Sequence, residues 1–194
     1  MNKVFCGNEM DKMPGWAFRI MAFMFNVTDL FKPTRKKLLP FNLRKGSTVV
    51  DYGCGTGRYL KQASELVGDS GLVYAVDIHE LAIESAFRII KRHGLKNVKP
   101  EKTDGNTTHI PSGIADLIYA LDMFHMVRNT FIFLQELKRI SKRDGILIIE
   151  DGHQPRALAK EKIMKSELWE IVEENDSFIT CRPKSQTGNN CAGN

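Results

Sequence analysis

The sequence is poor in cysteine. It has four, Cys6, Cys54, Cys181 and Cys191, and no two of them form a CxxC pair or a regular spacing. Zinc sites of the usual kind and disulfide frameworks both need cysteines at short or repeated intervals. We therefore expect neither of these in the protein, and we predict no metal site.

Long apolar runs and targeting signals are also lacking. No segment is apolar for long enough to span a bilayer. Asp11, Lys12 and Arg19 interrupt the region where a secretory signal would need a continuous apolar stretch. We therefore predict a cytoplasmic protein with no membrane partner.

A strong net charge is absent too. The 194 residues carry a formal charge of +5, whose densest run is Arg35 to Lys37, and no basic motif is interleaved with aromatic residues. Nucleic-acid-binding domains usually gather such charge on one face. A solvated surface is the favoured interpretation and an anionic partner the alternative, and no nucleic-acid partner is expected.

From Thr48 onward, short apolar runs alternate with helical patterns. The runs are apolar throughout, which is typical of a parallel sheet covered by helices on both faces. Strands are expected at 48–52, 72–77, 98–102, 115–121 and 146–150, and helices at about 57–67, 80–93, 130–142 and 155–166. The pattern predicts a doubly wound α/β fold.

The two ends of the chain differ from this pattern. Residues 168–174 and 177–182 are extended runs joined by an Asn-Asp turn signal, and they are too close together for a parallel crossover, so we expect an antiparallel hairpin. Near the N-terminus, 14–31 is apolar on nearly every side. Such a helix is buried by packing, covers a ligand pocket or serves a homodimer. A second short helix is expected at 33–39.

No internal repeat or linker divides the chain, so we expect a single domain over residues 1–194. Its parts would be an N-terminal helical cap (1–45), a cofactor-binding core (46–151), the last helix with the closing β-hairpin (152–183) and a flexible tail (184–194).

The most informative stretch is residues 49–60, which read VVDYGCGTGRYL. An apolar strand runs into Asp51 and then into a turn with glycines at Gly53, Gly55 and Gly57. Glycine lets a ligand lie directly on the main chain, and the start of the following helix offers unpaired N–H groups. The stretch predicts a cofactor that contains adenosine.

The glycine spacing discriminates between adenosine cofactors. The nicotinamide fingerprint is GxGxxG, whereas the turn here reads GxGxG and has Arg58 where that fingerprint would have its last glycine. Asp51, directly before the turn, favours a cationic cofactor by charge complementarity. The Walker pattern GxxxxGK[ST] is absent, which argues against an NTPase.

At these residues a family resemblance emerges. VVDYGCGTGRYL resembles motif I of class I S-adenosylmethionine-dependent methyltransferases of the type 11/25-like kind, and YAVDIHE resembles their motif II. LQELKRISKRDGILIIED resembles the segment that leads into their fifth strand. The resemblance covers about 46–151. It implies methyl transfer from S-adenosyl-L-methionine on a Rossmann-like seven-stranded sheet of order 3-2-1-4-5-7-6, with strand 7 antiparallel.

The resemblance also implies roles for individual residues. Asp51 would face the methionine end of the cofactor, directly or through water, and Asp77 would bind the ribose hydroxyls. Ile78 would pack on the adenine ring. The predicted cofactor site consists of Asp51, Tyr52, Gly53, Cys54, Gly55, Asp77, Ile78, Asp104, Gly105 and Leu121.

The loop after the third strand leaves one role open. In the family, an acidic residue there often accepts a hydrogen bond from the adenine amine, which would be Asp104, with Gly105 beside it. The loop is slightly longer here, so the role could shift to Asn106.

The acceptor side is less well defined. His125 follows the fourth strand, where relatives often carry a histidine, and it is either a structural histidine or a substrate-side acid or base. His153 is a second candidate for that role. The [DN]PP[YF] motif of DNA-base methyltransferases is absent, which favours a small-molecule acceptor. A non-catalytic S-adenosylmethionine-binding module and, more weakly, a nicotinamide oxidoreductase are the alternatives.

Overall fold

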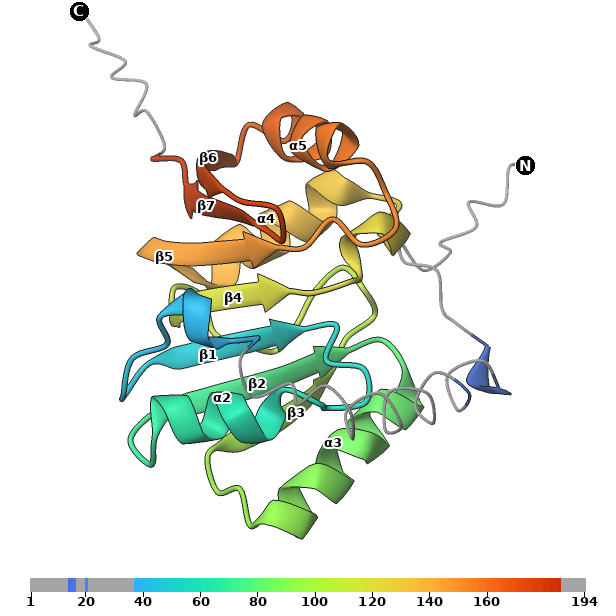
Figure 1. Cartoon of the computed structure of the whole chain (residues 1–194), viewed down its shortest axis with the longest axis vertical. Helices are drawn as coiled ribbons and strands as arrows, with labels where there is room; N and C mark the ends of the chain where they lie inside the picture. Colours follow the sequence, from blue (N-terminus) through green and yellow to red (C-terminus); the bar gives the residue numbers. More distant parts are fainter. Residues whose placement is uncertain (1–13, 17–19, 21–36, 186–194) are drawn as a thin grey trace, which may run out of the picture.

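A mixed sheet runs through the middle of the protein (Figure 1). The computed structural model describes residues 14–16, 20 and 37–185. The sheet has the order β3-β2-β1-β4-β5-β7-β6, and β7 is antiparallel to both of its neighbours. This order confirms the prediction. The strands are β1 (Thr48–Tyr52), β2 (Leu72–Asp77), β3 (Val98–Lys102), β4 (Ala115–Ala120), β5 (Ser141–Ile149), β6 (Trp169–Glu174) and β7 (Ile179–Pro183).

Helices cover both faces of the sheet and give it two apolar cores. One core contains side chains of α2 (Leu60–Val67) and α3 (Glu80–His93), together with the short helix η2 (Leu39–Phe41). The other contains side chains of α4 (Thr130–Ile140), α5 (Arg156–Lys165) and the short helix η3 (Phe124–Met126). The doubly wound α/β prediction is therefore correct.

Strand alternation decides which side chains reach which face. Successive residues of a strand point to opposite faces, so Val49 joins the α2 core and Val50 the α4 core. Asp51 points to the same face as Val49. Its register partner in β4 is Tyr119, whose ring lies in the α2 core. The register thus sets a buried carboxylate beside a buried phenol at the carboxyl end of β1.

The first helix of the core starts later than predicted. We expected it from about Gly57, but α2 begins at Leu60. The backbone at Gly57 has a φ of 77°, in the left-handed region, so the glycine turn continues to Tyr59. The turn is therefore longer than its glycines alone indicate.

The boundary between α4 and β5 also differs from the prediction. We expected a helix to residue 142 and a strand from 146, whereas α4 ends at Ile140 and β5 begins at Ser141. Ala115 pairs with Ser141 and Leu117 pairs with Ile146, so residues 142–145 form an irregular bulge. The predicted fourth strand also ends one residue early, at Ala120.

The predicted N-terminal helices fall largely outside the described residues. Of the helix expected at 14–31, only residues 14–16 and 20 are described, and Trp16 is 69% exposed. The role in a homodimer considered for this helix therefore lies outside the described residues. Of the second predicted helix, 33–39, only residues 37–39 are described, and they do not form it, because Leu39 begins η2 instead. Within the described ranges, no helix has the length and apolarity needed to cross a membrane.

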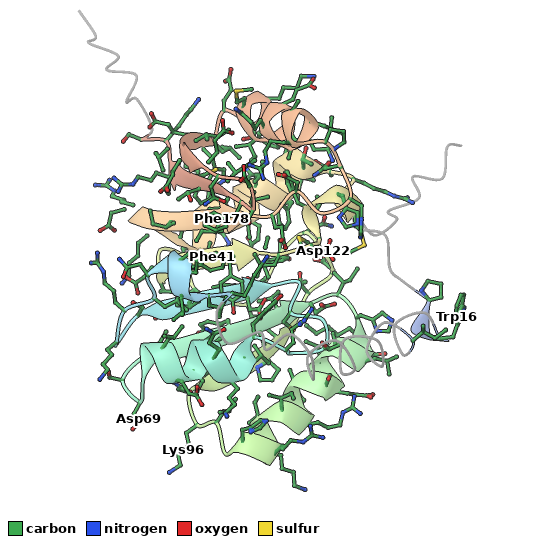
Figure 2. All side chains as sticks on the ribbon, in the orientation of Figure 1. Trp16, Phe41, Asp69, Lys96, Asp122 and Phe178 are labelled. Atoms are coloured by element: carbon green, nitrogen blue, oxygen red, sulfur yellow. The ribbon has the colours of Figure 1, made fainter. Side chains whose placement is uncertain are left out.

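An aromatic contact ties η2 to the closing hairpin. The rings of Phe41 and Phe178 meet edge to face with centroids 5.2 Å apart (Figure 2). Such pairs stabilise by about 0.5–1.5 kcal/mol beyond their area burial. The contact packs η2 against the hairpin, and the ion pair between Lys37 and Glu150 joins the preceding segment to the carboxyl end of β5.

Candidate functional site

The glycine turn after β1 is tied to the end of β2. The N–H groups of Gly53 and Cys54 both donate to the carbonyl of Val76, at 2.8 and 3.0 Å. Gly53 has a φ of 82°, and a Cβ there would lie 2.8 Å from Cγ of Met123. Both the backbone conformation and the close approach therefore require glycine at this position.

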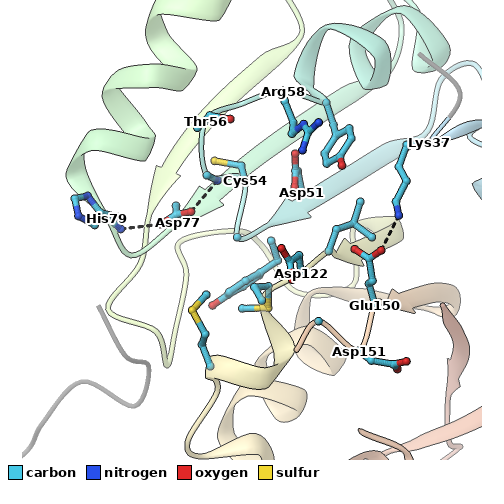
Figure 3. Close-up of a pocket in the computed structure, with 18 of the residues that line it drawn as sticks. Lys37, Asp51, Cys54, Thr56, Arg58, Asp77, His79, Asp122, Glu150 and Asp151 are labelled. Atoms are coloured by element: carbon cyan, nitrogen blue, oxygen red, sulfur yellow. Dashed lines mark hydrogen bonds and ion pairs between the residues drawn. The ribbon is translucent and has the colours of Figure 1, made fainter. Parts of the chain in front are cut away.

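Asp77 fixes the same turn through its side chain. One carboxylate oxygen accepts from the N–H of Gly55 at 2.9 Å and the other from the N–H of His79 at 2.8 Å (Figure 3). Burial raises the pKa of Asp77, and the two N–H groups oppose that rise. Each oxygen keeps a further lone pair, so the carboxylate can still accept hydrogen bonds from a ligand.

Asp51 is a buried carboxylate without a full set of partners. It is 2% exposed, and its Oδ2 has no hydrogen-bond partner among the described residues. Burial raises the pKa of Asp51 to about 8, the neighbouring Tyr119 hydroxyl opposes the rise, and Asp77 adds to it. A buried polar atom without a partner is costly, so Asp51 is suited to meet a positively charged ligand.

Cys54 lies in the turn as a packed side chain. It is buried, and burial holds the pKa of its thiol well above its ordinary value. A thiol in that state is a poor nucleophile and a poor metal ligand. Cys181 is likewise buried and free.

A cavity of about 610 Å³ opens at the carboxyl ends of the parallel strands. In open α/β sheets ligands bind in this crevice. The predicted cofactor residues line it, with the exception of Asp104 and Gly105; those that do are Asp51, Tyr52, Gly53, Cys54, Gly55, Asp77, Ile78 and Leu121. The structure thus brings the two motif carboxylates and the glycine turn to one cavity.

Asp104 caps its own loop. Its Oδ1 accepts from the N–H groups of Asn106 and Thr107 at 2.9 and 3.0 Å, which lower the pKa of this exposed carboxyl. Asn106, the alternative considered from the loop length, has a buried Oδ1 with no partner among the described residues. Neither residue lines the cavity in this structure.

The sequence did not predict several residues that line the other end of the cavity. Lys37 donates to Glu150 at 2.6 Å, and Asp151, Gly152, Asp176 and Ser177 also line this end. Asp151 and Gly152 follow β5, so the rule that parallel strands end at one edge could have identified them. Nothing in the sequence pattern indicates Lys37 or the hairpin tip, since these approach through tertiary packing.

Acidic side chains outnumber basic ones around the cavity. The lining carboxylates are Asp51, Asp77, Asp122, Glu150, Asp151 and Asp176, against Lys37 and Arg58. A cleft lined mainly by one sign of charge attracts ligands of the other sign. The cavity is therefore suited to a cationic ligand.

The two histidines considered for the acceptor side lie next to each other. The rings of His125 and His153 meet at 85° with centroids 5.1 Å apart, and Nε2 of His153 lies 3.8 Å from Oδ1 of Asp122. Burial lowers the pKa of His125, and Asp122 opposes that effect. Nδ1 of His125 is buried with no hydrogen-bond partner among the described residues.

Comparisons with known proteins agree with this geometry. A family model described as a methyltransferase domain matches residues 43–190. Demethylmenaquinone methyltransferase from Geobacillus stearothermophilus is 30% identical over 116 residues, which is 59% of this chain and 49% of that protein. Nocamycin O-methyltransferase from Saccharothrix syringae is 31% identical over 106 residues, covering 53% of this chain and 38% of that protein. The chain thus spans about half or less of the length of these curated relatives.

Solved structures extend the likeness over most of the chain. A SAM-dependent methyltransferase from Aquifex aeolicus has 26% identity and a TM-score of 0.70, covering 89% of this chain and 98% of that one. A putative S-adenosyl-L-methionine-dependent methyltransferase from Methanococcus maripaludis, 15% identical with a TM-score of 0.71, shares the fold. The buried Asp51 and the acidic cavity fit a cationic sulfonium cofactor. The chain therefore belongs to the methyltransferase-domain family, has the class I fold, and uses S-adenosyl-L-methionine as its cofactor.

Proposed function

We propose that the chain transfers the methyl group of S-adenosyl-L-methionine to a small-molecule acceptor by in-line displacement. The observation that carries this proposal is one cavity whose lining extends from Asp77 and the glycine turn, past Asp122, to Glu150 and Asp151 (Figure 3). A cofactor bound at the first end would present its methyl group to an acceptor bound at the second.

At the cofactor end, three side chains have distinct roles in the proposal. Asp77 accepts hydrogen bonds from the ribose hydroxyls while the N–H groups of Gly55 and His79 hold its carboxylate in place. Asp51 meets the charged methionine end. Ile78 packs on the adenine ring, and Asp104 or Asn106 binds the adenine amine if their loop moves toward the cavity.

Methyl transfer from this cofactor needs few catalytic groups from the protein. When bound, the cofactor supplies a methyl group already activated by its sulfonium charge. What the chain contributes is alignment in a cavity from which water is excluded, and alignment can provide effective molarities of roughly 10⁵ M or more. Met123 and Met126 line the cavity with apolar surface suited to excluding water.

A small acceptor suits the size of the cavity. About 610 Å³ lies within the range of roughly 300–1,000 Å³ typical of small-molecule sites, and the cofactor takes part of this space. Two curated relatives are named for a quinone precursor and for nocamycin, both of them small molecules. A small organic molecule is therefore the proposed class of acceptor.

We also propose that residues 1–194 act as one domain, with 1–45 as a cap over the acceptor end. Lys37 belongs to this segment, lines the cavity and pairs with Glu150 after β5. That contact supports a cap that reaches the acceptor end.

Labelled-methyl transfer tests the proposed function. The full chain is incubated with S-adenosylmethionine labelled in its methyl group and with fractions of a small-molecule extract. We expect label in at least one small molecule, and less of it when Asp77→Ala replaces the wild type at an S-adenosylmethionine concentration below the wild-type dissociation constant. If S-adenosylhomocysteine binds but no fraction is ever labelled, the chain is a non-catalytic binding module and the proposal is wrong.

A further inference from the structure

Three possible metal ligands converge at the acceptor end of the cavity, although they come from separate parts of the sequence. Asp122 follows β4, His125 lies in η3, and His153 follows β5. One donor atom from each, a carboxylate oxygen or a ring nitrogen, lies within 4.8 Å of the other two. Because β4 and β5 are parallel neighbours, their carboxyl ends bring these residues to the same edge of the sheet.

The chain makes room for the His125 ring at this point. Gly152 has a φ of 65°, and a Cβ there would lie 2.1 Å from Nδ1 of His125, so no other residue could occupy position 152 without displacing the imidazole. Asp122 has a φ of 51°, which is uncommon for a residue other than glycine. These two backbone conformations determine where the side chains of Asp122 and His125 can lie.

The ion pairs around the cluster leave the carboxylate of Asp122 available to bind a cation. At the same end of the cavity, Glu150 pairs with Lys37 and Asp151 pairs with Arg156. Within the part of the chain that the structure describes, the basic side chain within ion-pair distance of Asp122 is His153, at 3.8 Å. Asp122 thus has no Lys or Arg partner there to compete with a bound cation.

We propose that Asp122, His125 and His153 bind a divalent transition metal ion of the zinc type. Two imidazoles and one carboxylate are ligands that suit zinc, iron and manganese better than magnesium or calcium. Ligand bonds of about 2.0–2.2 Å require donor atoms about 3–4 Å apart, so the cluster has to contract by about 1 Å. Rotation of His153 can supply this, since its side chain is 82% exposed.

The site has a defined place relative to the proposed reaction. Asp122 and Gly152 both line the cavity (Figure 3), so the ion would lie at its rim, where the acceptor enters. An ion held by three ligands has open positions, and a hydroxyl or thiol bound there loses its proton to water more readily. This role for the metal rests on the proposed function. In it His125 acts as a ligand, which is neither the structural role nor the acid–base role considered from the sequence.

Metal titration tests the site without cofactor or acceptor. The chelator-treated full chain is titrated with Zn²⁺ by calorimetry and with Co²⁺ by absorption spectroscopy. We expect one saturable site, no thiolate-to-cobalt charge-transfer band, and binding at least tenfold weaker in His153→Ala and His125→Ala. The matched control is His109→Ala, because His109 is an exposed histidine 2.9 Å from the carboxylate of Glu101, and this variant should bind as the wild type does.

The proposal is overturned if no saturable binding occurs, or if His153→Ala binds Zn²⁺ as tightly as the wild type. A thiolate band that persists in that variant would assign the metal to cysteines and would equally overturn it. S-adenosylhomocysteine binding in His153→Ala should remain at the wild-type level, which shows that the variant is folded. If the wild type bound no S-adenosylhomocysteine, the proposed function would fail while the metal result stood separately.

Discussion

Asp51 is the residue whose chemistry depends most on its surroundings. In the free protein its carboxyl is buried beside Tyr119 of β4, Asp77 of β2 and Cys54 of the turn, and its pKa is about 8. Arg58, at the end of the turn, lines the same cavity (Figure 3). At neutral pH the free protein therefore holds Asp51 mainly protonated, whereas a cationic cofactor favours the ionised form.

Cofactor binding should therefore release a proton. Near pH 7 we expect S-adenosylmethionine to displace up to one proton from Asp51, since the bound charge lowers its pKa. Calorimetry in buffers of different ionisation enthalpy measures this release. Asp51→Asn should lose it. Equal proton release in the two proteins would show that Asp51 does not titrate on binding.

The same residue should make the stability of the free protein depend on pH. Its folded-state pKa of about 8 lies above the ordinary carboxyl pKa of 3.8 that applies in the unfolded chain, so between these pH values the folded state holds the proton and the unfolded state has lost it. The contribution of Asp51 to stability is complete below about pH 4 and is lost as pH rises to about 8, by up to about 1.4 kcal/mol per pH unit.

Denaturant melts of Asp51→Asn and wild type from pH 5 to pH 8 test this. The free energy of unfolding of the variant should rise relative to that of the wild type as pH increases. A difference that stays constant over this range would contradict the raised pKa.

Among the elements, β5 begins earlier than the sequence predicts, and its pairing with β4 explains why. The helix–strand pattern indicated a stop at Asp144-Gly145, but α4 ends at Ile140 and the chain pairs at Ser141 before it bulges. A helical spacing of apolar residues cannot reveal that residues 141–145 are extended, because the pairing of Ser141 with Ala115 is a tertiary contact. Strands β1, β2 and β3 and helix α3 match their predicted ranges, since local apolar runs and the Gly94 C-cap define them.

The bulge gives a stability prediction at Gly145. A Cβ there would lie 2.3 Å from Oγ of Ser141 and 3.0 Å from the carbonyl oxygen of Ala115. Gly145→Ala should therefore destabilise the protein by about 2–3 kcal/mol, the upper part of the usual range for overpacking, and by more than the control. The control is Gly113→Ala, where a Cβ meets nothing within 4 Å and the cost of about 1 kcal/mol comes from its φ of 68°. Equal losses in urea melts would argue against a tight bulge.

At the scale of the whole molecule, the sequence indicated the cavity residues near the glycine turn better than those at the other end of the cavity. Motif residues such as Asp51 and Asp77 come from consecutive strands, and the parallel fold takes their ends to one cavity. The end of the cavity proposed for the acceptor combines Lys37, the end of β5 and the hairpin tip at Ser177, which are far apart in sequence and converge through packing alone. The cluster of Asp122, His125 and His153 arises in the same way, which is why the sequence indicated no metal site.

Ligand binding should stabilise the whole fold. A ligand at 100 times its dissociation constant adds about 2.7 kcal/mol to the free energy of unfolding. For a chain of this size S-adenosylhomocysteine should then raise the melting temperature by about 5–11 °C. Differential scanning fluorimetry measures this, with NADH at the same concentration as the control. A rise with NADH and none with S-adenosylhomocysteine would contradict the cofactor assignment.

Calorimetric titration with S-adenosylhomocysteine tests whether the cavity beside Asp77 holds the cofactor. Asp77→Ala should weaken binding by about 1–3 kcal/mol, or about 5- to 150-fold, because charge-assisted hydrogen bonds to the ligand are lost. Asp69→Ala, which removes an exposed carboxylate in the turn before the amino end of β2 (Figure 2), should bind as the wild type does. Unchanged affinity in a folded Asp77→Ala protein would show that the cofactor does not bind at Asp77.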